Sequence, residues 1–202
     1  MTNKEFSARI KNACEAVKGA RDELTEIDSK FGDADHGVTM VKVADTIYKA
    51  VSDESASIKQ MLDNAAMDVM CLNGGSAVPL WNTWLDGMQE NAPDCDEIDI
   101  AGIKTIFASA FTALDEISGA KVGDKTMMDA LIPASQAIAA YEGNDVGALF
   151  EAAAKAAWEG AEASKQFVSK FGRAKSYGTK TIGTPDAGAT SMAYFFKGLA
   201  QS

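Results

Sequence analysis

The stretch FGDADHGVTM, residues 31–40, concentrates groups that could hold a metal ion and, through it, phosphate. It contains Asp33, Asp35 and His36, and Asp28 lies five residues before Asp33. Magnesium prefers oxygen ligands and is usually held by a few carboxylates together with substrate phosphates. Two residues turn an ideal helix by about 200°, so Asp33 and Asp35 can meet at one ion only in a loop. The spacing favours a magnesium site in an interhelical turn, with solvated helix caps as the alternative.

His36 is the only histidine of the chain, which excludes a two-histidine metal site. Magnesium is bound by oxygen ligands, so an imidazole is an unusual ligand for it. A ring nitrogen can instead donate a hydrogen bond to phosphate or ribose, and we favour this role for His36. A covalent phospho-acceptor and a turn histidine bonded to the backbone remain open alternatives.

Three glycine-containing turns directly precede expected helices: HG at 36–37, NGGS at 73–76 and DAGAT at 186–190. A helix N-terminus offers free N–H groups and the positive end of the helix dipole, which together bind anions. Three such helix starts at one rim of a bundle would form a phosphate site. Ordinary capping is the alternative for each of them.

Two further segments bear on the site. GAKVGDKT at 119–126 is one residue short of a P-loop and follows a helix instead of a strand, so we interpret it as a helix start with Asp124 or Thr126 near the cap. The connector at 171–188 is rich in glycine and basic residues and is long for a link between helices. Such loops are often binding segments, and a mobile surface loop is the alternative.

The bulk composition excludes several classes of partner. The chain has 202 residues, a net charge of -10 and an isoelectric point near 4.6, so nucleic acid and anionic membranes are poor partners. No stretch is apolar enough to span a membrane, and the N-terminus lacks the apolar core of a signal peptide. The three cysteines have no metal-binding spacing. We therefore expect reduced thiols and a cytoplasmic protein.

Helical periodicity dominates the chain. In the first segment apolar residues recur at spacings of three and four, which places them on one helical stripe: Phe6, Ile10, Ala13, Val17, Ala20, Leu24 and Ile27. Glycine, proline, asparagine and aspartate punctuate the segments. We predict eight helices and no sheet, in one all-α domain covering 1–202 with antiparallel neighbours. The expected helices cover 3–28, 36–52, 56–72, 77–90, 98–118, 124–141, 145–170 and 188–200.

Four motifs occur in a characteristic order: IDSKFGDADHGVTM, NGGSAVPLWNTW, GDKTMMDALIPA and GRAKSYGTKTIGTPDAGATSMAYFF. Together they resemble the nucleotide-binding (DhaL) subunits of bacterial dihydroxyacetone kinases, over nearly the whole chain. The resemblance implies an eight-helix antiparallel up-and-down barrel that holds nucleotide and magnesium at one end.

The resemblance also implies site residues. The carboxylates that match the family's ligands of two magnesium ions are Asp28, Asp33 and Asp35. The positions that match its nucleotide contacts are His36, Gly37, Val38, Thr39, Ser76, Ala77, Gly119, Met127, Arg173, Asp186, Ala187 and Gly188. No side chain is assigned as a catalytic acid or base.

The chain departs from the family pattern in the phosphate loop. Where the family has Gly-Gly-x-Ser-Gly-Pro-Leu, this chain has Gly74-Gly75-Ser76-Ala77-Val78-Pro79-Leu80, so the hydroxyl has moved by one position and valine replaces glycine. A valine would be strained if the turn required a positive φ there. Thr39 and Ala187 replace the usual asparagine and proline.

The resemblance implies a phosphotransferase that works with partner subunits, and it permits a homodimer. In the favoured reading, tightly bound ADP takes a phosphoryl group from a phosphohistidine protein of the sugar phosphotransferase system. The transient ATP passes the group to dihydroxyacetone held on a separate kinase subunit, as part of glycerol metabolism. The alternatives are an ATP-consuming kinase unit for another small sugar or polyol and a non-catalytic, nucleotide-binding regulatory subunit.

Overall fold

The computed structural model describes residues 1–201, and all its regular elements are helices. The α-helices are α1 (Asn3–Gly19), α2 (Arg21–Ser29), α3 (His36–Ala50), α4 (Ile58–Met70), α5 (Ala77–Glu90), α6 (Ile100–Ser118), α7 (Met128–Ala140), α8 (Val146–Ala163) and α9 (Ala187–Leu199). Two 3-10 helices, η1 (Ser164–Gln166) and η2 (Arg173–Thr181), follow α8. The described residues contain a single isolated β-bridge and no strand, which confirms the all-α prediction.

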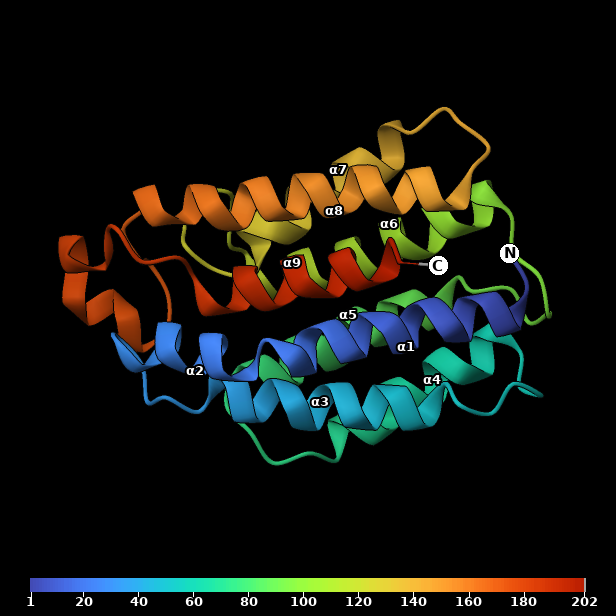
Figure 1. Cartoon of the computed structure of the whole chain (residues 1–202), viewed down its shortest axis with the longest axis horizontal. Coiled ribbons are helices and arrows are strands. Elements are labelled where there is room, and N and C mark those ends of the chain that lie inside the picture. The colour runs from blue at the N-terminus through green and yellow to red at the C-terminus, as the bar shows by residue number, and fades with distance from the viewer. Residues whose placement is uncertain (202) are drawn as a thin grey trace.

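The helices form a closed bundle in which neighbours along the chain pack side by side. The sequence of contacts runs from α1 through α3, α4, α5, α6, α7 and α8 to α9, and α9 packs back against α1. Figure 1 shows both termini near one end of the bundle and the segment after α8 at the opposite end, beside α2. This second end is where α2 stops and where α3, α5 and α9 begin, so it collects several helix N-termini.

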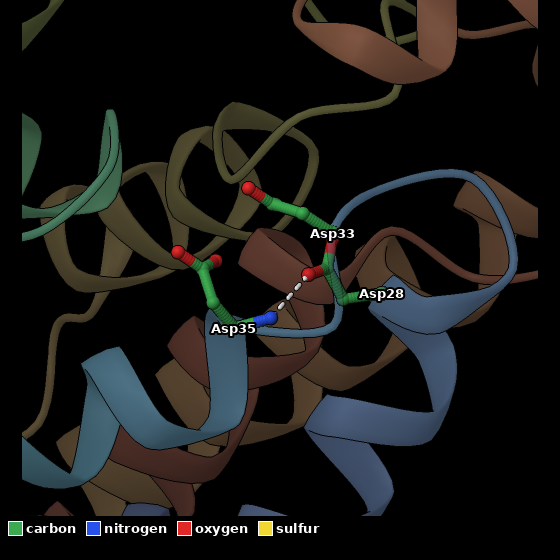
Figure 2. A group of neighbouring side chains, drawn as sticks. All are labelled: Asp28, Asp33 and Asp35. Atoms are coloured by element: carbon green, nitrogen blue, oxygen red, sulfur yellow. Dashed lines mark hydrogen bonds between the residues drawn. The ribbon is translucent and has the colours of Figure 1, made fainter.

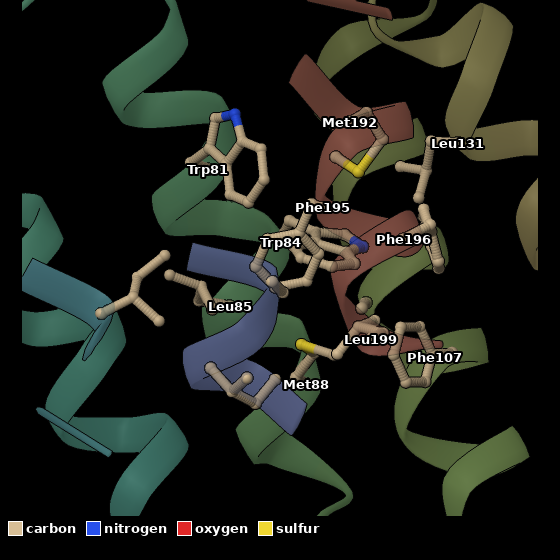
Figure 3. Close-up of a cluster of buried hydrophobic side chains, with 14 of the residues drawn as sticks. Trp81, Trp84, Leu85, Met88, Phe107, Leu131, Met192, Phe195, Phe196 and Leu199 are labelled. Carbon is tan, nitrogen blue, oxygen red and sulfur yellow. The ribbon is translucent and has the colours of Figure 1, made fainter. Parts of the chain in front are cut away.

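The bundle is filled by aromatic side chains from three helices. Trp81 and Trp84 of α5 pack edge to face against Phe195 of α9, with ring centroids 5.2 and 5.4 Å apart. Phe107 of α6 and Phe196 of α9 extend the cluster (Figure 3), and all five side chains are at most 2% exposed. Buried aromatic pairs stabilise by about 0.5–1.5 kcal/mol beyond their area burial, so this cluster fixes α9 against α5.

The long first helix that the sequence predicts is divided in two. Ala20 has φ −89° and ψ 3°, which ends α1 and starts α2. The apolar stripe nevertheless continues, because Val17, Ala20, Leu24 and Ile27 are all buried. One non-helical residue therefore changes the direction of the chain without moving the apolar face away from the core.

Two other boundaries differ from the prediction. The helix expected over 124–141 begins only at Met128, and the helix expected over 145–170 ends at Ala163. Both shortened ends lie at the end of the bundle that holds α2, so the freed segments 119–127 and 164–186 build its surface there. Across residues 1–201, every helix is too short or too polar to cross a bilayer.

Candidate nucleotide and metal site

A cleft of about 640 Å³ opens at the end of the bundle where α3, α5 and α9 begin. Its walls are the end of α2 with the following loop, the end of α6 with the turn at 119–127, and the segment between α8 and α9. The three glycine-containing turns therefore meet at this cleft, as predicted, because 36–37, 73–76 and 186–190 each contribute lining residues.

Three carboxylates converge at one side of this cleft. Asp28 comes from the last turn of α2, and Asp33 and Asp35 come from the loop before α3 (Figure 2). Each offers an oxygen atom, and these three oxygens all lie within 4.8 Å of one another. Asp28 Oδ2 also accepts hydrogen bonds from the backbone N–H groups of Asp35 (3.1 Å) and His36 (3.3 Å). An all-oxygen donor set at this spacing fits a hard divalent cation such as magnesium.

The backbone of the loop is shaped to bring the carboxylates together. A Cβ atom on Gly32 would lie 2.0 Å from Asp28 Oδ1, so only glycine allows the chain to pass this close to the carboxylate. Ala34 has a φ of 60°, which is unusual for a residue with a side chain. This conformation lets Asp33 and Asp35, on either side of it, share one face of the loop.

A cation from the far wall already contacts this cluster. Arg173, at the start of η2, places a guanidinium nitrogen 2.8 Å from Asp33 Oδ2. Close by, the rings of Phe31 and Tyr177 pack with centroids 5.2 Å apart. These contacts join the segment after α8 to the aspartate loop across the mouth of the cleft. Of the described residues that line the cleft, Arg173 and Lys125 are the two with lysine or arginine side chains.

Asp186, at the start of α9, has a carboxyl group with a raised pKa. Asp186 Oδ2 accepts the N–H of Ala189 at 2.8 Å and so caps α9. Burial raises the pKa of Asp186 to about 7, and the nearby Asp129 charge adds to this, while the Ala189 N–H and Lys125 oppose it. At neutral pH this wall of the cleft is therefore less negative than its composition suggests.

His36 joins the starts of two helices. Its Nε2 lies 3.2 Å from Ser191 Oγ, and the Ser191 hydroxyl donates to the Gly188 carbonyl at 2.9 Å. Since a serine hydroxyl has one hydrogen, Nε2 is the donor in the first contact. Burial lowers the pKa of His36, against the attraction of Asp28 and Asp35, which favours a neutral ring. The ring thus holds α3 to α9 at the cleft wall.

The altered phosphate loop is accommodated without backbone strain. Ser76 is the N-cap of α5 with φ −59°, and Val78 lies within the first turn of that helix. Val78 is not among the residues with positive φ, so the condition under which it would be strained is not met. A Cβ on Gly74 would meet the Val78 side chain at 2.5 Å, which shows that the valine occupies space left by this glycine.

Twelve of the fifteen expected site residues line the cleft: Asp28, Asp33, Asp35, His36, Thr39, Ser76, Ala77, Met127, Arg173, Asp186, Ala187 and Gly188. Three do not. A Cβ on Gly37 would lie 2.2 Å from the Arg21 carbonyl oxygen, so this glycine permits close packing of α3 on α2. Val38 is 39% exposed, and Gly119 ends α6 with a φ of 61°.

Several lining residues are missing from the sequence-based assignment. The apolar ones include Phe31, Leu80, Ile117 and Phe171, which come from four separate segments. Periodicity assigns such residues to the core or to solvent, and only the folded arrangement brings them together. Lys125 is the charged residue among the omissions, because a lysine in a glycine-containing turn is ordinarily solvated.

The fold and the cleft together define an all-α protein with an acidic pocket at one end of its helical bundle. Within that class, the model of the DAK2 domain matches residues 30–201. The chain therefore belongs to the Dak2 family.

Two relatives illustrate the similarity. D-erythrulose kinase of Mycolicibacterium smegmatis is 34% identical over 184 residues, covering 89% of this chain and 32% of that protein. The ADP-binding subunit DhaL of the PEP-dependent dihydroxyacetone kinase 1 of Listeria innocua is 28% identical over 189 residues, covering 93% of this chain and 90% of the subunit. The chain thus spans about a third of the length of the erythrulose kinase and matches most of the Listeria subunit.

A solved structure shares the fold. The dihydroxyacetone kinase of C. freundii in complex with AMP-PNP and Mg²⁺ superposes with a TM-score of 0.71 at 23% identity, covering 96% of this chain and 33% of that one. The helical bundle predicted from the resemblance is therefore confirmed at the level of the fold.

Proposed function

We propose that this chain is the ADP- and magnesium-binding unit of a kinase for a short ketose, with residues 1–202 acting as one nucleotide-binding domain. In this proposal a phosphohistidine protein of the phosphotransferase system supplies the phosphoryl group. Bound ADP accepts it and passes it to dihydroxyacetone on a partner subunit. The observation that carries the proposal is the convergence of three carboxylates, three helix N-termini and Arg173 on one cleft.

The carboxylates have the role of holding cations. Asp28, Asp33 and Asp35 present oxygens close enough for shared coordination, and the backbone N–H groups that bind Asp28 Oδ2 fix that side chain in place. Two magnesium ions bound there would neutralise the charge of a diphosphate, which an acidic chain could not otherwise approach.

The remaining groups position the nucleotide. Helices α5 and α9 begin at the cleft, and the backbone N–H groups left free at these helix starts can donate to phosphate oxygens. Arg173 can donate to phosphate or ribose, and the apolar wall with Ile117 and Met127 can accept the base. Phosphoryl transfer depends mostly on positioning and on neutralising charge, so a site without an evident catalytic base is consistent with it.

The similarity to the Listeria subunit supports the relay, because this chain contains the counterpart of nearly that whole protein. A second candidate is an ATP-consuming kinase unit that acts on erythrulose. The 34% identity to the D-erythrulose kinase favours it, and the two candidates differ in whether nucleotide is a resident group or a substrate.

The experiment that separates them is mass analysis of nucleotide released when the purified protein is denatured, with and without prior chelation of magnesium. Stoichiometric ADP that survives extensive washing and is lost after chelation supports the relay. An empty site that binds ATP reversibly supports the ATP-consuming kinase. A protein that binds neither nucleotide contradicts both.

The acceptor requires a separate test with the sugar-binding partner present. Protein carrying γ-labelled ATP is mixed with that partner and with either dihydroxyacetone or erythrulose, and the labelled sugar phosphate is quantified. Label recovered on His36, identified by its acid lability, would instead support the covalent alternative. Label recovered only on nucleotide and sugar excludes it.

A further inference from the structure

Lys125 is a buried lysine that the proposed mechanism leaves without a role. Its side chain is 4% exposed, and its backbone has a φ of 61°. The turn is held in this uncommon shape by Asp129, which is fully buried. Its Oδ1 accepts the N–H of Gly123 at 2.6 Å and its Oδ2 accepts the N–H of Thr126 at 2.7 Å. The sequence GDKTMMD thus builds a rigid support that points one ammonium group inward.

The ammonium group joins two points that are far apart in the chain. Lys125 Nζ donates to the carbonyl oxygens of Ser164 (2.6 Å) and Thr184 (2.5 Å). These carbonyls flank the segment 167–183, which we call the lid segment. The N–H of Gly183 donates to the Lys165 carbonyl at 2.7 Å, so the last residue of the lid segment is also joined directly to the chain just before the segment. Lys125 therefore lies at the base of a closed loop.

The same turn holds the first part of the lid segment. The N–H of Lys170 donates to the Asp124 carbonyl at 3.1 Å, and Lys170 Nζ donates to Asp124 Oδ1. Beyond this point the lid segment has glycines with positive φ at 172, 178 and 183. Its contacts with the aspartate loop are the exposed ion pair of Arg173 and the packing of Tyr177. The lid segment is therefore firmly held at its base, through Lys125 and Asp124, and only lightly held where Arg173 and Tyr177 contact the aspartate loop.

Burial of an ammonium group is costly, which argues against a role in packing alone. Burial lowers the pKa of Lys125, while the charges of Asp186 and Asp129 oppose this. Lys125 also lines the cleft. The group is therefore placed where the lid segment, the start of α9 and the nucleotide pocket meet.

We propose that Lys125 is a positioning residue whose ammonium group fixes the base of the lid segment and thereby places Phe171 and Arg173 over the bound nucleotide. The effect on nucleotide rests on the proposed function, whereas the effect on the lid segment does not. Removal of the ammonium group frees two carbonyl groups at the base, so the lid segment opens more often and nucleotide leaves faster.

Lys104 provides a matched control. Its Nζ also donates to two backbone carbonyls, those of Ala139 and Tyr141, but it lies near the start of α6, at the end of the helix away from the cleft. Lys104→Met removes the same kind of contact without touching the lid segment. Lys125→Arg is the second control, because it keeps a cation with several donors.

The experiment measures hydrogen exchange of the lid segment by mass spectrometry and the rate of ADP release in magnesium, for wild type and each variant. Lys125→Met is expected to speed lid exchange and ADP release by about tenfold or more, since two hydrogen bonds to a charged donor are lost. Lys104→Met is expected to change both by less than about twofold. Lys125→Arg is expected to restore part of the loss.

Equal effects of Lys125→Met and Lys104→Met on the lid segment and on ADP release would overturn the inference. Lys125→Gln replaces Lys125→Met in the same comparison if the methionine variant does not fold. A wild-type protein that retains no ADP in magnesium contradicts the proposed function instead. In that case the hydrogen exchange of the lid segment alone decides the role of Lys125.

Discussion

Replacement of Arg173 by alanine should have opposite effects on two ligands. The guanidinium lies 2.8 Å from Asp33 Oδ2, so it occupies one of the three carboxylates proposed to bind a cation. A divalent cation added alone must displace it, and we expect Arg173→Ala to bind that cation more tightly. Magnesium-ADP should bind more weakly to the same variant, because the displaced arginine would otherwise donate to the nucleotide.

The size of each effect follows from exposure. The Arg173 side chain is 72% exposed and that of Asp33 is 39% exposed. Exposed ion pairs contribute about 0.2–1 kcal/mol, and about 1.4 kcal/mol corresponds to a factor of ten. The gain in cation affinity should therefore be roughly 1.4- to 5-fold. A hydrogen bond to a charged phosphate contributes about 1.5–3 kcal/mol, so ADP affinity should fall by about tenfold to a hundredfold.

The assay is a titration of nucleotide-free protein with Mn²⁺, followed by electron paramagnetic resonance of the free ion, and a calorimetric titration with ADP at saturating magnesium. Lys175→Ala is the matched control, since it removes one positive charge from the same lid segment at an exposed residue two positions away. Equal Mn²⁺ affinity in Arg173→Ala and Lys175→Ala would refute the competition. Weaker Mn²⁺ binding in Arg173→Ala would refute it as well.

Three further predictions concern the cleft and the core. Asp33→Asn should abolish magnesium-dependent ADP retention, measured by nucleotide content after washing, and unchanged retention would remove Asp33 from the metal site. The pKa of Asp186 is about 7 in the folded protein, compared with 3.8 for an ordinary aspartate in the unfolded chain. The folded state therefore holds more protons between about pH 4 and about pH 7, and this contribution to stability is lost as pH rises through that window. Asp186→Asn, which can still cap α9, should flatten the decline in urea midpoint, and a parallel decline in both proteins would contradict the assignment. Burial raises the pKa of Cys14 to about 12, whereas Cys71 and Cys95 are exposed. A thiol reagent should therefore modify Cys71 and Cys95 in the native protein and Cys14 only after unfolding. Rapid modification of all three cysteines would contradict the burial of Cys14.

The helices were predictable because each carries its own apolar stripe, and such a stripe can be recognised from the spacing of apolar residues within one segment. The break at Ala20 was not predictable from that stripe, since Val17, Ala20 and Leu24 remain buried on both sides of it. Periodicity reports which face is buried and is insensitive to a small change of direction.

The convergence of the three aspartates was predictable for a related reason. Asp28, Asp33 and Asp35 lie within eight residues, so a single turn is enough to bring them together. The assignment of the nucleotide contacts depended on the resemblance to a known family. It placed Gly37 in the site, although the close approach of the Arg21 carbonyl gives this glycine a packing role.

Lys125 could not have been found in this way. Its burial depends on the carbonyls of Ser164 and Thr184, which are 39 and 59 residues away in sequence. Local spacing carries no information about partners at such a distance. A buried cation in a glycine-containing turn becomes visible only after the chain has closed around it.

The distribution of charge supports the proposed polyanion site in an otherwise acidic chain. The net charge is -10, but the lid segment contains Lys170, Arg173, Lys175 and Lys180 and no acidic residue. The three aspartates that repel a phosphate line the cleft, and Arg173 is the one of these four basic residues that lines it as well. Arg173 offsets part of the negative charge of the aspartate loop through its ion pair with Asp33. A bound cation would take over that neutralisation, and Arg173 would then be free to meet the nucleotide while Lys125 keeps the base of the lid segment in place.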